Sequence, residues 1–153
     1  MTQPFHVLRR IRFSDCDPAG IVFYPQYFVL LNGVVEDWFD GPLGLGYQRT
    51  IMQRRIGLPT VHLEAQFEQV SRFGDDVAFT VDVHRLGRRS FTLDLACRGR
   101  VGELRMRARK VIVTTCLDTH QAIEVPEDVR RAIEGYDSAA QRLTGTSPAR
   151  TPG

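Results

Sequence analysis

The chain has 153 residues, the size of one domain with a substantial hydrophobic core. Its net charge of +2 and 42% hydrophobic content are ordinary for a globular protein, and nothing in them indicates a nucleic-acid or membrane partner. No apolar run approaches the roughly 20 residues that span a bilayer. Residues 1–6 lack the features of a signal peptide. The 3 cysteines have no metal-ligand spacing, which favours a reduced, cytoplasmic protein.

The first predicted element is a strand over residues 5–13, where apolar and polar side chains alternate imperfectly. A turn rich in Asp, Pro and Gly follows. Pro25 then opens a helix, because apolar residues recur every three or four positions until Gly41 ends the pattern. Residues 47–55 predict a second, short helix.

Beyond residue 59 the apolar period becomes two, which predicts strands joined by glycine-containing turns. These strands are expected over residues 61–68, 77–83, 91–97 and 103–115. The last strand changes phase near Lys110, which predicts a β-bulge. Its alternating arginines, Arg105, Arg107 and Arg109, are expected to face solvent.

The C-terminal segment predicts a short helix from Pro126, followed by a tail rich in Ser, Thr, Gly and Pro. We therefore expect one domain over residues 1–135 and a loose tail over residues 136–153. A long apolar helix followed by hairpin-connected strands indicates an α+β domain, with a curved antiparallel sheet wrapped around the helix. Complete burial of so apolar a helix needs a second surface, so an oligomer is expected.

Three segments resemble the hotdog-fold acyl-CoA thioesterases, in particular the 4-hydroxybenzoyl-CoA thioesterase family. They are DCDPAGIVFYP at residues 15–25 with Tyr27, then RRSF at residues 88–91, and AIEVP at residues 122–126. The first segment is the most specific. The resemblance implies an acyl-CoA substrate, no metal or redox cofactor, and a homotetramer built as a dimer of dimers. It also implies an active site at a subunit interface.

The resemblance assigns the chemistry to Asp17 and to the backbone N–H of Tyr24. A carboxylate beside a helix start pairs a reactive group with N–H groups that favour negative charge. Asp17 would attack the thioester carbonyl or activate water, and both routes stay open. The Tyr24 N–H would polarise the carbonyl oxygen. An Asp-Pro pair outside this segment would indicate only a turn.

Cys16 is interpreted as a packing residue, because its acidic neighbours disfavour the thiolate that a nucleophile requires. Asp15 is expected to hydrogen-bond within the turn.

Substrate contacts are expected from several further positions. Arg88 and Arg89, with Ser90, are candidates for the phosphates of coenzyme A, although a solvated basic turn explains them equally well. The other predicted substrate-binding residues are Gly20, Tyr27, Asn32 and Thr60. Gly20 has an equally plausible role as a turn glycine.

Two positions depart from the family pattern and leave the acyl group open. The family tends to have Asn where Gln26 stands and a carboxylate where Asn32 stands. The acyl group is therefore either aromatic, similar to 4-hydroxybenzoyl, or of short to medium length.

Four alternatives compete with this prediction. A hotdog dehydratase or hydratase would want an Asp–His pair, and residues 13–39 contain no histidine. A hotdog thioesterase using a glutamate on the helix has Glu36 available. A non-catalytic acyl-CoA-binding module would bind the ester without releasing thiol. The arginine-rich strands alone suggest a nucleic-acid binder, against the near-neutral net charge.

Overall fold

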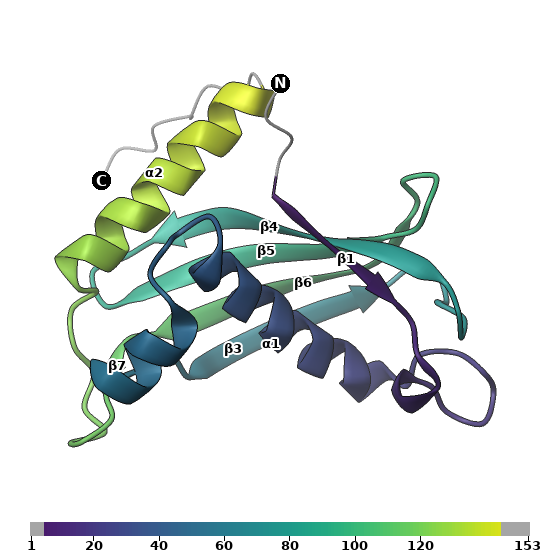
Figure 1. Cartoon of the computed structure of the whole chain (residues 1–153), viewed down its shortest axis with the longest axis horizontal. Helices are drawn as coiled ribbons and strands as arrows, with labels where there is room; N and C mark the ends of the chain where they lie inside the picture. The colour runs from purple at the N-terminus through teal and green to yellow at the C-terminus, as the bar shows by residue number, and fades with distance from the viewer. Residues whose placement is uncertain (1–4, 145–153) are drawn as a thin grey trace.

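The computed structural model describes residues 5–144 and contains one five-stranded antiparallel sheet curved around a central helix, α1 (Tyr24–Asp40) (Figure 1). The strand order in this sheet is β1-β4-β5-β6-β3. Its strands are β1 (His6–Arg10), β3 (Thr60–Phe67), β4 (Asp76–Leu86), β5 (Ser90–Arg98) and β6 (Leu104–Val113). The α+β prediction of a sheet wrapped around one long helix is confirmed.

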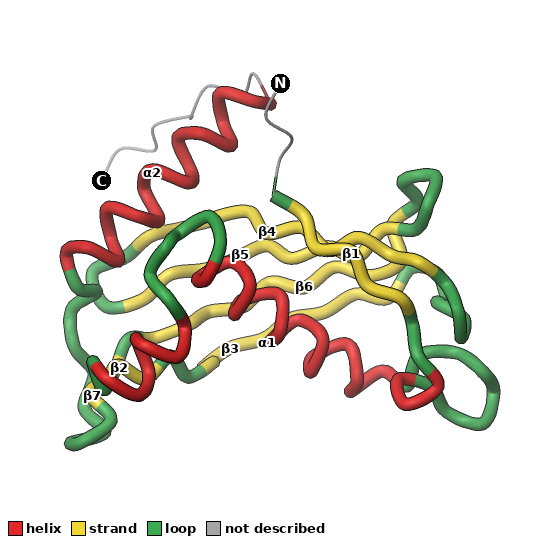
Figure 2. Tube along the Cα trace, in the orientation of Figure 1, coloured by secondary structure: helices red, strands yellow, loops and turns green. Residues whose placement is uncertain are grey.

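The shorter elements connect this framework (Figure 2). A 3-10 turn, η1 (Phe13–Asp15), follows β1, and a π-helical turn, η2 (Arg49–Gln53), stands where a short second helix was predicted. β2 (Ile56–Gly57) and β7 (Thr115–Cys116) form a separate two-stranded ladder. No helix in the described range is long and apolar enough to cross a membrane.

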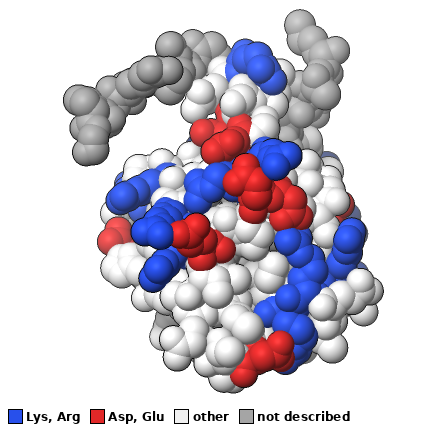
Figure 3. Space-filling model, turned by 90° about the vertical axis from the view of Figure 1, so that its left-hand side faces the viewer, with Lys and Arg blue, Asp and Glu red and all other residues white. Residues whose placement is uncertain are grey.

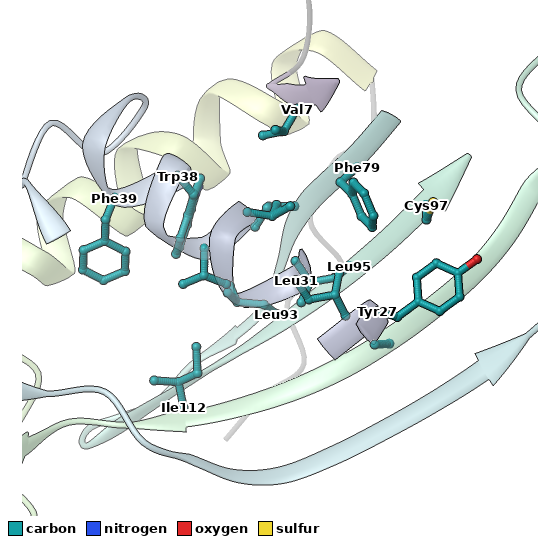
Figure 4. Close-up of a cluster of buried hydrophobic side chains, with 14 of the residues drawn as sticks. Val7, Tyr27, Leu31, Trp38, Phe39, Phe79, Leu93, Leu95, Cys97 and Ile112 are labelled. Atoms are coloured by element: carbon teal, nitrogen blue, oxygen red, sulfur yellow. The ribbon is translucent and has the colours of Figure 1, made fainter. Parts of the chain in front are cut away.

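Helix α1 packs against the sheet through one stripe of apolar side chains. Pro25 lies in its first turn, where a missing N–H costs nothing, and Gly41 N–H caps the far end on the Asp37 carbonyl at 2.8 Å. The buried side chains of the helix are Tyr27, Leu31, Val34, Val35, Trp38 and Phe39. Figure 4 shows the stripe packed against the sheet residues Phe79, Leu93, Leu95 and Ile112. Each such side chain contributes roughly 1.5–3 kcal/mol of hydrophobic stabilisation.

The predicted β-bulge at Lys110 is wrong. Alternate side chains of β6 stay on the buried face from Met106 through Lys110 to Ile112, so the strand keeps its phase. The register shift beside this stretch lies on the neighbouring strand β3, between Thr60 and His62. A second irregularity lies earlier on β6, where the pairing with β5 skips Arg105. The break in apolar alternation therefore marks a lysine on the core face of the sheet.

The C-terminal helix is longer than predicted. α2 (Glu127–Thr144) has 18 residues and packs on β4, so the predicted domain end at residue 135 falls inside it. Beyond that point the Tyr136 ring lies 5.4 Å from the Trp38 ring. The folded unit thus includes α2, and residues 145–153 of the predicted tail lie outside the described range.

Candidate active site

The Asp-rich segment folds into a closed turn at the start of α1. Phe23 N–H donates to the Asp15 carbonyl at 3.0 Å, and Cys16 and Val22 form an isolated β-bridge. Gly20 closes the turn with an N–H bond to the Asp17 carbonyl at 2.9 Å and a φ of +76°. That φ favours glycine, so the turn role predicted for Gly20 is confirmed.

The Asp17 carboxylate is half-buried and already takes part in this turn. Its Oδ1 accepts a 2.9 Å bond from the Ala19 N–H, the geometry of an Asx turn. Its Oδ2 has no hydrogen-bond partner within residues 5–144. The turn-forming and reactive roles of Asp17 are therefore compatible, because they use different oxygens.

The backbone N–H of Tyr24 is the free donor at the helix start. Pro25 has no N–H, and Gln26 N–H is already bonded to the Phe23 carbonyl at 2.8 Å. In the described part of the chain the Tyr24 N–H meets no acceptor. The positive end of the helix dipole reinforces it, so this N–H suits a developing oxyanion.

Asp15 hydrogen-bonds within the turn and Cys16 packs against the core, as predicted for each. The buried Asp15 carboxylate accepts bonds from Arg12 N–H at 2.8 Å and Gln26 Nε2 at 3.2 Å. Desolvation, followed by the nearby charges of Asp15 and Asp17, raises the pKa of the Cys16 thiol. This shift disfavours the thiolate that a cysteine nucleophile requires.

A second loop, residues 68–75, is hydrogen-bonded to the Asp17 turn and is called the bracing loop. Val22 N–H donates to the Ser71 carbonyl at 2.9 Å, and Phe73 N–H donates to the Gly20 carbonyl at 2.9 Å. The Tyr27 hydroxyl donates to Ser71 Oγ at 2.8 Å. Tyr27 is only 4% exposed, so the structure places it in the core, and its predicted contact with substrate stays a prediction.

Arg105 anchors this bracing loop, contrary to the prediction that it faces solvent. Its side chain is 14% exposed, and its guanidinium bonds the Val70 carbonyl at 2.8 Å. It also pairs with Asp75 at 2.9 Å and Glu103 at 2.8 Å. Hydrogen bonds from the Arg72 N–H and from Arg105 lower the pKa of Asp75. The sequence shows acidic residues at positions 75 and 103, but only the fold reveals that both lie beside Arg105.

The predicted phosphate-binding turn lies at the other end of the sheet. β4 begins beside the Asp17 turn and runs 11 residues to Leu86, so the Arg88–Ser90 turn is on the order of 35 Å away. Both arginines are exposed there, and Arg88 Nε is bonded to Glu124 Oε1 at 2.7 Å. This end faces the viewer in Figure 3, where basic and acidic side chains lie side by side. One chain does not bring this turn to Asp17.

An apolar strip joins α1 to the edge strand β3 on the side of the Asp17 turn. The exposed Phe67 ring contacts the rings of Tyr24, Tyr27 and Phe28 at 5.9–6.4 Å between centroids. Asn32 lies two helical turns beyond Tyr24, is exposed, and accepts a 2.5 Å bond from Lys110 Nζ. The predicted contact residue Thr60 lies at the opposite end of β3 from Phe67.

Two hollows among the described residues lie away from Asp17 and Tyr24. One of about 450 Å³ is on the outer face of the sheet, among residues such as Asp94 and Arg107. Another, of about 490 Å³, lies beside the bracing loop, and neither is lined by Asp17 or Tyr24. No group of three His, Cys, Asp or Glu side chains within residues 5–144 could hold a metal ion.

A sheet curved around a helix, with a carboxylate turn at the helix start, defines a hotdog-fold protein of the thioesterase type. Residues 11–133 match the Thioesterase-like superfamily, and the chain belongs to this family.

Named relatives match this chain over most of their length. 4-Hydroxybenzoyl-CoA thioesterase from Pseudomonas sp. (strain CBS-3) is 32% identical over 136 residues, covering 84% of this chain and 96% of the relative. 1,4-Dihydroxy-2-naphthoyl-CoA hydrolase from Synechococcus sp. (strain CC9902) is 29% identical over 140 residues, covering 82% and 87%. A solved gentisyl-coenzyme A thioesterase structure is 26% identical, with a TM-score of 0.76 over 84% of this chain and 99% of the other.

Proposed function

We propose that this protein is an acyl-CoA thioesterase that hydrolyses aromatic acyl-CoA esters to the free acid and coenzyme A. The observation that carries the proposal lies at the start of α1, where an Asp17 oxygen and the Tyr24 N–H both have no hydrogen-bond partner within residues 5–144. A carboxylate and a preorganised donor are the two groups that attack on a thioester carbonyl requires.

Asp17 acts on the thioester carbon while the carbonyl oxygen receives the Tyr24 N–H bond. In the nucleophilic route, Asp17 Oδ2 adds to the carbon, and the C–S electron pair leaves with the coenzyme A sulfur. The sulfur takes a proton from water. Water then cleaves the mixed anhydride and restores the carboxylate. In the general-base route, Asp17 instead removes a proton from the water that attacks the carbon.

The aromatic acyl class is supported from two directions. The strip beside the site is lined by aromatic and aliphatic side chains, with Tyr24 61% and Phe67 49% exposed. The relatives above carry the names of enzymes for hydroxybenzoyl, dihydroxynaphthoyl and gentisyl esters of coenzyme A. A flat ring suits a strip bounded by Phe67 and the first turns of α1.

The proposed assembly is a cytoplasmic homotetramer, a dimer of dimers. β3 is an exposed edge strand of 8 residues, and such edges are templates for pairing with a second strand. Two-fold antiparallel pairing about its centre would set Thr60 of one chain opposite Phe67 of the other. Thr60 would thereby reach the site, and assembly offers a route for Arg88, Arg89 and Ser90 to reach the coenzyme A phosphates. The cysteines are all free, in keeping with a reducing compartment.

The activity is tested by thiol release from benzoyl, hydroxybenzoyl, phenylacetyl and aliphatic coenzyme A esters. We expect aromatic esters to be cleaved fastest, and Asp17→Asn to lower kcat by about 10³-fold or more with the fold retained. Glu36→Gln is the matched control, because Glu36 lies on α1 12 residues, or about 18 Å, beyond Tyr24.

Two results would contradict this assignment. Folded protein that binds the esters and releases no thiol would be a binding module, and loss of turnover in Glu36→Gln alone would move the catalytic carboxylate to the helix.

The shared site is tested by complementation. Asp17→Asn chains and Arg88→Ala/Arg89→Ala chains are refolded separately and together. Mixed assemblies should recover activity at low coenzyme A ester concentration, since one kind of site then combines an intact Asp17 with an intact arginine turn. Absence of recovery, with mixed oligomers verified by mass, would confine each site to one chain.

A further inference from the structure

Lys110 is the single lysine of the chain, and it points into the core. Its residue exposure is 6%, and its cross-strand neighbours are Leu63 on β3 and Leu93 on β5. The other 19 cations among the 20 Lys and Arg residues are arginines. A buried ammonium between two leucines is costly unless something compensates its charge.

The chain itself gives Lys110 little compensation. An ammonium has three donors, and one of them meets Asn32 Oδ1 at 2.5 Å. Within residues 5–144, Lys110 makes no ion pair and no second hydrogen bond. The carboxylates of the flanking strands, Glu64 and Asp94, pair with other groups on the opposite face of the sheet. Two donors are therefore available to an incoming group.

The position of Asn32 gives a ligand access to this ammonium. Asn32 is exposed on the face of α1 that borders the apolar strip, so a ligand oxygen can replace its amide oxygen at Nζ. Tyr24 and Asn32 are separated by about 12 Å along the helix axis. Helical side chains lean toward the N-terminus, so the Asn32 side chain lies closer to the Tyr24 N–H than this axial distance. A ring attached to a carbonyl at Tyr24 would span this distance together with the hydrogen bonds at its two ends.

We infer that Lys110 recognises an oxyanion on the far end of the acyl group, so that the preferred substrates are aromatic acyl-CoA esters bearing a ring carboxylate or an ionised ring hydroxyl. This inference rests on the proposed function for the placement of the thioester at Tyr24. Binding of such a substrate replaces the neutral amide oxygen of Asn32 by a charged oxygen at Lys110 Nζ. Hydrogen bonds between charged partners are stronger than those to neutral groups. Burial lowers the pKa of Lys110, and a bound oxyanion opposes that effect.

The kinetic test compares 4-carboxybenzoyl-CoA, 4-hydroxybenzoyl-CoA and benzoyl-CoA. Loss of a charge-assisted bond corresponds to about 10- to 100-fold, so wild type should prefer an acidic ester over benzoyl-CoA by at least about tenfold in kcat/KM. Comparison of 4-carboxybenzoyl-CoA with 4-hydroxybenzoyl-CoA shows whether Lys110 binds a ring carboxylate or an ionised ring hydroxyl. Lys110→Met should abolish the preference and leave benzoyl-CoA hydrolysis within about threefold of wild type.

Arg107→Met is the matched control, because it removes an exposed cation from the same strand on the opposite face. It should leave the preference intact. A preference that survives in Lys110→Met, or that wild type lacks, overturns the inference.

A binding readout separates this inference from the proposed function. Lysine labelled with ¹³C at Cε gives one NMR signal in this chain, observed in an Asp17→Asn background that stops turnover. 4-Carboxybenzoyl-CoA should move the signal, and benzoyl-CoA should move it far less. Such selective movement without hydrolysis of any ester by wild type would refute the enzyme but keep the recognition. Equal movement, or none, would refute the recognition.

Discussion

β6 carries two largely buried cations that the fold treats in opposite ways. Arg105 is bonded to the Val70 carbonyl and to the carboxylates of Asp75 and Glu103. Lys110, further along the strand, is bonded only to the neutral amide of Asn32 among the described residues. Arg105 thus has several partners in its own chain, whereas two N–H donors of Lys110 have no partner among the described residues.

The difference separates a positioning residue from a recognition residue. Arg105 holds the loop that braces the Asp17 turn, so its loss should affect every substrate alike. Lys110 contributes a cost to folding that its own chain does not offset, a pattern expected of residues kept for function. The two cations therefore predict opposite effects on stability and different effects on substrate choice.

The largest effect is expected from Arg105→Met. It leaves Asp75 and Glu103 without their cation, and breaking such a pair costs about 2–4 kcal/mol of unfolding free energy at this degree of exposure. Urea denaturation at fixed protein concentration measures it. Arg107→Met, exposed on the same strand, should stay within about 0.5 kcal/mol of wild type. Equal stabilities of the two variants would remove Arg105 from its anchoring role.

Lys110→Met should act in the opposite direction and stabilise the protein by about 1–2 kcal/mol, because it removes a buried charge and keeps the side-chain volume. The same denaturation experiment measures it. A destabilised variant would mean that another subunit supplies a carboxylate to Lys110, and the contrast with Arg105 would then break down.

A smaller loss, of about 1 kcal/mol, is expected from Tyr27→Phe, which removes the bond to Ser71 Oγ. Ser71 Oγ also accepts from Arg105 at 3.3 Å, so the two losses should be non-additive in the double variant. Strict additivity would show that the helix and Arg105 brace the loop independently.

The pH dependence of the Arg105→Met deficit is expected to be smaller than these effects. Hydrogen bonds lower the pKa values of Asp75 and Glu103, so their contribution is present above the ordinary values of 3.8 and 4.5 and is lost as pH falls further. The deficit of Arg105→Met should therefore shrink in acid.

The alkaline side tests the other cation. Burial lowers the pKa of Lys110, so the folded state releases its proton before the unfolded state does, and wild type gains stability as pH rises toward 10.5. The advantage of Lys110→Met should therefore shrink in alkali. An advantage that stays constant up to that pH would show that the lysine is not desolvated.

The comparison also shows what the sequence can and cannot predict. The α1 helix and the turn at Asp17 follow from local spacing, and the structure confirms both. The side-chain environments of Arg105 and Lys110 do not, because period-two alternation cannot tell a buried cation from a phase change. The partners that decide their roles, Asp75 and Asn32, are distant in sequence.

The same limit applies to assembly of the site. Local segments indicated Thr60 and the Arg88–Ser90 turn, yet the fold places both far from Asp17 within one chain. Only pairing between chains can bring them together, and sequence patterns carry no direct information on that geometry.

The most direct test measures kcat/KM for 4-carboxybenzoyl-CoA and benzoyl-CoA in Arg105→Lys and Lys110→Met. Arg105→Lys keeps the charge but loses the fork between two carboxylates, so it should lower both values by the same factor. Lys110→Met should lower only the value for the acidic ester. A changed ratio in Arg105→Lys, or an equal loss on both esters in Lys110→Met, would contradict the division between positioning and recognition.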